Sequence, residues 1–136
     1  MIEHVLLMMA IEERWPNLVH GRDYWVRHPL DPKTGLQSGD ALIDTWNSSI
    51  PCPDDITELL KRAEELRPVL AAKKAEQQVR DKRDSLLRAS DWTQASDAPP
   101  DTRERWAEYR SALRDVPQQA GFPLNVVWPQ APTPQN

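Results

Sequence analysis

The histidines are the residues whose chemistry could most directly build a metal site. His20, Asp23 and His28 lie close together in the sequence, and imidazole and carboxylate groups both bind divalent metals. Their spacing matches none of the standard zinc patterns. We therefore expect these histidines to form ordinary hydrogen bonds, with no metal and no cofactor bound.

The other residues capable of catalysis also lack the setting that catalysis needs. Cys52 is the only cysteine, so it cannot form an intrachain disulfide, and the nearby Asp54 and Asp55 disfavour the thiolate of a nucleophile. No carboxylate pair stands isolated in an apolar segment, as acid–base catalysis would require. The chain has only four glycines and no phosphate-binding or nucleophile-elbow motif. The sequence thus favours a protein that binds partners over an enzyme.

Bulk composition narrows the class of partner. A chain of 136 residues fits one domain, or a small domain with a helical appendage, and its net charge of -4 disfavours general nucleic-acid binding. The apolar run near the N-terminus is too short to span a bilayer and has no basic lead, so we expect no membrane partner. Six tryptophans and thirteen prolines are the unusual counts. Tryptophan often lies at protein interfaces.

Periodicity and turn residues predict the elements of the N-terminal half. Apolar spacing predicts a helix over residues 2–14, which ends before Pro16. Strand-forming residues on either side of "DPKTG" predict a β-hairpin of residues 23–27 with 41–46. A helix capped by Asp54 or Asp55 follows, and Pro68 either kinks it or begins a second helix. Residues 69–89 have strong helix propensity and recurring charges of alternating sign, which indicate a solvated face.

The C-terminal part predicts a second helix and a short strand. Asp101 and Glu104 stand at capping-box positions for a helix that carries Trp106, Tyr109 and Leu113 on one face. "LNVVW", residues 124–128, reads as a short strand, and residues 129–136 as a frayed tail. The predicted fold class is α+β, with an N-terminal helix, a small antiparallel sheet, a long central helix and a C-terminal helical unit. We divide the chain into residues 1–52, 53–89 and 90–136.

The aromatic residues of the C-terminal part have two readings. Trp92, Trp106, Tyr109 and Trp128 could form a small core, or they could form a partner-binding surface. We expect core packing for most of them, with Trp106 meeting Trp92 across the "APPD" corner. Whether Trp92 is fully buried or shared with a partner stays open.

The run from residue 83 to residue 129, "RDSLLRASDWTQASDAPPDTRERWAEYRSALRDVPQQAGFPLNVVWP", closely resembles the phage tail assembly chaperone family. Residues 18–46 also look like the N-terminal part of some members. The family's signature matches the following positions: Arg83, Asp84, Leu86, Leu87, Asp91, Trp92, Thr93, Gln94, Trp106, Tyr109, Arg110, Leu113, Arg114 and Asp115.

The resemblance implies a non-enzymatic role without a cofactor. The expected partner is a trimeric phage tail fibre protein, which the chain would bind in the host bacterial cytoplasm and help to fold and assemble. Self-association and retention on the virion stay open. The alternative is a structural tail component, such as a fibre tip or adaptor subunit, without folding activity. The candidate partner-binding residues are Trp92, Trp106, Tyr109, Phe122, Val126 and Trp128.

Overall fold

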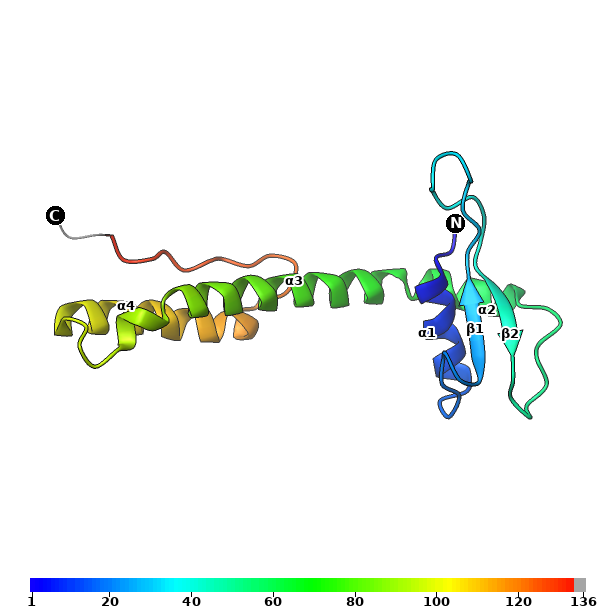
Figure 1. Cartoon of the computed structure of the whole chain (residues 1–136), viewed down its shortest axis with the longest axis horizontal. Coiled ribbons are helices and arrows are strands. Elements are labelled where there is room, and N and C mark those ends of the chain that lie inside the picture. The colour runs from blue at the N-terminus through cyan, green and yellow to red at the C-terminus, as the bar shows by residue number, and fades with distance from the viewer. Residues whose placement is uncertain (134–136) are drawn as a thin grey trace. The chain divides into compact units, whose positions relative to one another are not determined.

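The computed structural model describes residues 1–133 (Figure 1). The chain divides into two compact units, and the boundary between them falls after Leu70. The first unit contains α1 (His4–Arg14), β1 (Tyr24–Arg27), β2 (Leu42–Trp46) and α2 (Thr57–Glu65). α3 (Arg67–Ala89) is followed by the short 3-10 helix η1 (Asp91–Gln94), α4 (Pro100–Asp115) and a second 3-10 helix, η2 (Val116–Gln118). This arrangement confirms the α+β class, the N-terminal helix and the long central helix. The division into residues 1–52, 53–89 and 90–136 stays a prediction.

The core of the N-terminal unit forms between α1, the sheet and α2. α1 buries Leu6, Leu7, Ala10 and Ile11, which recur at helical spacing along one face. They pack in one cluster with Tyr24 and Val26 of β1, and with Leu59 and Ala63 of α2. α1 ends at Arg14, as predicted, because the residue before Pro16 avoids helical backbone angles.

The predicted β-hairpin is confirmed. β1 and β2 pair antiparallel, with Tyr24 opposite Trp46 and Arg27 opposite Leu42, and an irregularity interrupts the register after Trp25. Arg27 Nε lies 2.6 Å from Asp44 Oδ1 on the partner strand. The turn chemistry also holds, since Asp31 Oδ1 accepts hydrogen bonds from two successive main-chain N–H groups, both at 2.8 Å.

Pro68 begins a second helix rather than kinking a single one. α2 ends at Glu65 and α3 starts at Arg67, so Pro68 lies in the first turn of α3, where a missing N–H costs no helical hydrogen bond. At the start of α2, Asp55 Oδ1 accepts the Thr57 N–H at 2.8 Å. The predicted cap at Asp54 or Asp55 is nevertheless wrong, because Ile56 occupies the N-cap position of α2 and no side chain makes a capping hydrogen bond there.

Two C-terminal predictions are wrong. Asp101 caps nothing, because α4 starts one residue earlier at Pro100, with Pro99 preceding it and no side-chain cap. Proline at the first helical position has its backbone angle already set, which removes the need for a capping box. Residues 124–128 form no strand, since Val126 to Trp128 carry no regular structure and the neighbouring segments offer no strand to pair with. Of the predicted frayed tail, residues 134–136 lie outside the described residues.

Replacing a leucine of the N-terminal core should destabilise that unit strongly. Leu7 is fully buried, so Leu7→Ala removes apolar contacts and leaves a cavity, with an expected loss of about 2–5 kcal/mol in the free energy of unfolding. Leu36 is 69% exposed, and Leu36→Ala should change stability by less than about 0.5 kcal/mol. Urea denaturation followed by circular dichroism measures both. Equal effects of the two substitutions would contradict this core.

Acid should also weaken the N-terminal unit. Main-chain N–H groups of Thr34 and Lys33 lower the pKa of Asp31, and hydrogen bonds from Thr57 lower the pKa of Asp55. A carboxyl group whose folded pKa is depressed stabilises the protein fully above its unfolded pKa, near 4, and this contribution is lost as pH falls through the folded value. Melting temperatures measured from pH 6 to pH 2 should therefore fall below about pH 4, and less steeply in Asp31→Asn. If the variant has the same pH profile as the unmodified protein, the hydrogen bonds of Asp31 in the turn do not stabilise the folded state.

Candidate partner-binding surface

A buried arginine joins α4 to the end of α3. Nη1 of Arg110 donates hydrogen bonds to the main-chain oxygen of Leu87 at 2.6 Å and to Ser90 Oγ at 2.7 Å. Nη2 donates to Asp91 Oδ1 at 2.8 Å. The last carbonyls of a helix have no partner within it and carry partial negative charge, so a cation is stabilising there. Arg110 thereby fixes the antiparallel course of α3 and α4 (Figure 1).

The turn between these helices is fixed by its own polar side chains. Thr93 is fully buried, and its hydroxyl donates to the Ser90 carbonyl at 2.6 Å. Gln94 Nε2 donates to the Arg103 carbonyl on α4 at 3.1 Å. The "DWTQ" segment is therefore a folded 3-10 turn whose side chains bond to Ser90, directly after α3, and to Arg103 of α4. This local order decides where the intervening Trp92 points.

Three aromatic side chains meet beside this turn. The ring centroids of Trp92 and Trp106 are 6.2 Å apart, and those of Trp106 and Tyr109 are 5.5 Å apart in an edge-to-face arrangement. The predicted contact of Trp92 with Trp106 is confirmed. Burial falls along the row, from buried Tyr109 through half-buried Trp106 to Trp92, which is 62% exposed. Trp92 is thus held at its base and offers most of its indole surface to solvent.

The C-terminal tail, residues 121–133, lies along the helices without a strand partner. A Cβ at Gly121 would collide with the main-chain oxygen of Asn125, so only glycine admits the tight turn that starts the tail. The side chain of Gln119 then binds both main-chain groups of Val127, with Oε1 accepting its N–H at 2.9 Å and Nε2 donating to its carbonyl at 2.8 Å. One amide side chain therefore takes the place of a neighbouring strand.

Cations of α3 cover two aromatic rings of the tail. The Arg80 guanidinium carbon lies 5.5 Å from the centroid of the Phe122 ring. The Lys82 ammonium lies 4.4 Å from the centroid of the Trp128 ring. Both distances fall within the range of cation–π attraction. Phe122, Val126 and Trp128 are all half-buried, which places them in intramolecular contacts rather than in a fully exposed patch.

Two grooves border the tail on α4. The larger, of about 480 Å³, is lined by Trp92, Pro99, Asp101, Thr102, Arg105, Trp106, Pro132 and Thr133. The smaller, of about 370 Å³, has Tyr109 and Ala112 on one side and Pro129 and Pro132 on the other. Of the predicted partner-binding residues, the structure thus brings Trp92, Trp106 and Tyr109 together.

Sequence reasoning missed the most exposed apolar side chains of this unit. Leu124 is 70% exposed and Val127 is 78% exposed, whereas Val126 between them is half-buried. It also missed Gln119, whose side chain positions Val127. Gln119 lies within the run that resembles the chaperone family, but a sequence resemblance does not state what its amide binds. These three residues join the candidate surface.

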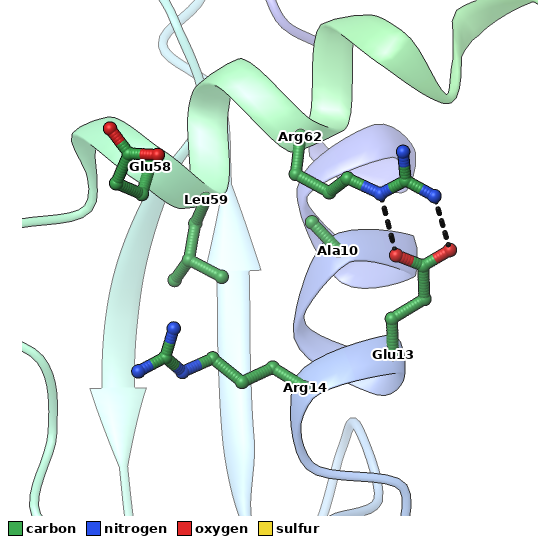
Figure 2. Close-up of a pocket in the computed structure, with 6 residues that line it drawn as sticks. All are labelled: Ala10, Glu13, Arg14, Glu58, Leu59 and Arg62. Carbon is green, nitrogen blue, oxygen red and sulfur yellow. Dashed lines mark hydrogen bonds and ion pairs between the residues drawn. The ribbon is translucent and has the colours of Figure 1, made fainter.

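A groove of the N-terminal unit is lined by carboxylates and arginines, as a polar active site could be, but its carboxylate Glu13 is paired with an arginine. Its walls are Ala10, Glu13, Arg14, Glu58, Leu59 and Arg62 (Figure 2). Arg62 Nε and Nη2 donate to the two carboxylate oxygens of Glu13 at 2.8 and 3.1 Å, and this pairing lowers the pKa of Glu13. A carboxyl group held charged by a cation is a weak general base at neutral pH. We therefore interpret this groove as structural, since the ion pair of Glu13 with Arg62 joins α1 to α2.

The histidines do not come together as a metal site. His20 Nε2 accepts the Val26 N–H at 3.4 Å, whereas His28 lies against His4, with their Nδ1 atoms 3.0 Å apart. Among residues 1–133, no group of three His, Cys, Asp or Glu side chains could hold a metal ion. Burial raises the pKa of Tyr24 to about 12, so this phenol stays neutral. Cys52 is an exposed free thiol.

Removing the Arg110 guanidinium should loosen the C-terminal unit. Arg110→Ala leaves the buried Ser90 hydroxyl without its donor and removes the shortest hydrogen bond to the Leu87 carbonyl, which keeps only its bonds from Ser90. The expected loss is about 1–3 kcal/mol in the free energy of unfolding. Arg114→Ala is the matched control, because that side chain is exposed on the same helix. Limited proteolysis should cut between α3 and α4 faster in Arg110→Ala alone. Unchanged cleavage would show that the hydrogen bonds of Arg110 are not needed to hold α3 and α4 together.

Comparison with sequence models of known families gives two matches that together cover the described part of the chain from residue 7. The XkdW protein family matches residues 7–77, more than half of the chain, and the phage tail assembly chaperone protein family matches residues 76–133. No curated protein and no solved structure matches. None of the helices within residues 1–133 has the length and apolar character needed to cross a membrane. The chain belongs to the XkdW protein family, carries a phage tail assembly chaperone region at its C-terminus, and has a role in phage tail assembly.

Proposed function

We propose that this protein is an assembly chaperone that binds a phage tail fibre protein and assists its folding and trimerisation. The observation that carries the proposal is the exposed indole of Trp92 on the locked α3–α4 turn, inside the region matched by the chaperone family. A chaperone-family match also points to a non-enzymatic role. We place its action in the host bacterial cytoplasm, during assembly.

The exposed side chains suit an unassembled fibre subunit. A subunit that has not yet trimerised exposes apolar surface and strand edges that lead to aggregation. Trp92, Leu124 and Val127 offer apolar contact area, with Trp92 fixed on the turn and Val127 held by Gln119. Side chains positioned before binding lose little conformational entropy when they bind. This preorganisation supports a surface that shields a partner.

The basic residues of α3 support a protein partner rather than nucleic acid. Arg80 is paired with Glu76 at 2.9 Å, and Arg83 with Asp84 at 2.8 Å. Arg80 and Lys82 also lie over aromatic rings of the tail. These cations serve contacts within the chain, and nucleic-acid binding needs a basic face available for phosphates.

Co-expression with the fibre protein of the same phage tests the proposal. Trp92→Ala combined with Val127→Ser should lower the yield of soluble fibre trimer severalfold, because both apolar contacts are removed. Leu36→Ala, an exposed leucine of the N-terminal unit, is the control and should leave the yield unchanged. Trimer yield is measured by gel filtration.

The opposite outcome would favour the structural alternative. If fibre trimers form equally well without this protein, and mass spectrometry finds it in purified particles, the protein is a tail component and not a folding factor. If trimers need the protein, its presence in particles shows retention on the virion after assembly. Gel filtration of the protein alone reports whether it self-associates.

A further inference from the structure

The tail of this chain shows what kind of segment the surface of α4 accommodates. Residues 126–133 have no regular secondary structure and include Pro129 and Pro132. They are held through side chains, by the amide of Gln119 at Val127 and by the Lys82 ammonium over Trp128. An extended segment that contains prolines therefore already lies against this helical unit, without any strand pairing.

The 480 Å³ groove beside the tail has the walls of a proline-binding site. Trp92 and Trp106 form one side, their rings tilted 55° to each other so that they form a wedge rather than a stack. Pro99 and Pro132 also line it. Proline has no N–H to satisfy and loses little entropy on binding, so grooves lined by aromatic rings favour proline-containing extended segments.

The groove also has polar residues that could bind the main chain of an extended segment. Asp101, Thr102 and Arg105 on α4 line the same groove. A segment that lies there would place its proline rings against Trp92 and Trp106. Its carbonyl oxygens would then lie within reach of the donors of Arg105. Trp92, 62% exposed, has most of its surface available for this contact.

We propose that this groove binds an extended, proline-containing segment of the partner, with the chain's own tail as the outer wall. This inference rests on the proposed function, since it names the part of the partner that the chaperone holds. The tail is a component of the site and is not displaced. Its position depends on Gln119, which therefore acts as a positioning residue for the groove.

Binding of a synthetic peptide to the full chain tests the groove without any fibre protein. The probe is a blocked peptide of repeating Ala-Pro-Pro, and the control peptide has serine in place of each proline. Calorimetry should detect binding of the proline peptide only, and Trp92→Ala should weaken it by about tenfold or more. Leu36→Ala should leave it unchanged. Equal binding of the serine peptide, or no binding of either, would overturn the proposal.

The Gln119→Ala substitution shows whether the tail stays in place as part of the groove or is displaced by the bound peptide. If the tail is a wall of the groove, losing both bonds to Val127 should weaken peptide binding severalfold, in the same direction as Trp92→Ala. If the peptide instead displaces the tail, the same substitution should tighten binding, and the proposal fails. The co-expression experiment can succeed when peptide binding fails, so the chaperone function and the groove are tested separately.

Discussion

The C-terminal unit depends on one buried guanidinium group. Arg110 satisfies the end of α3 through Leu87 and Ser90, and it pairs with Asp91 where η1 begins. No apolar side chain at that position could supply three donors to a main-chain carbonyl, a hydroxyl and a carboxylate at once. The turn between α3 and α4, and with it the direction of Trp92, follows from this contact. Removing it would leave the buried Ser90 oxygen without its donor, which is more costly than the loss of an exposed ion pair.

The hydrogen-bonded turn holds the exposed side chain of Trp92 in one position, which suits it to bind a partner. Trp92 rests on Trp106, which rests on buried Tyr109, so one indole is presented from a row of packed rings. The tail adds Val127, whose main chain is held by Gln119 while its side chain faces solvent. The surface therefore combines apolar exposure with fixed geometry. A protein that shields folding intermediates needs both properties, because flexible apolar groups lose more entropy on binding.

Elements with strong local signals were predictable from the sequence, and long-range positions were not. The hairpin, the helices and the break near Pro68 follow from periodicity and proline geometry. The strand at residues 124–128 was wrong because β-branched residues favour extended backbone, whereas a strand also requires a neighbour, and Gln119 takes that place. The cap at Asp101 was wrong because Pro100 starts the helix by itself. The contact of Trp92 with Trp106 was predictable from the short corner, but the exposure of Trp92 depends on Arg110 and Thr93, whose partners no spacing reveals.

Hydrogen–deuterium exchange of the complex with the tail fibre protein tests the central claim most directly. The claim is that the partner contacts the C-terminal unit at the turn that carries Trp92 and at the tail. The account predicts slower exchange on complex formation in residues 91–106 and 119–133, with α1 and the β-hairpin unchanged. Protection confined to residues 1–70 would contradict it and would transfer partner binding to the N-terminal unit.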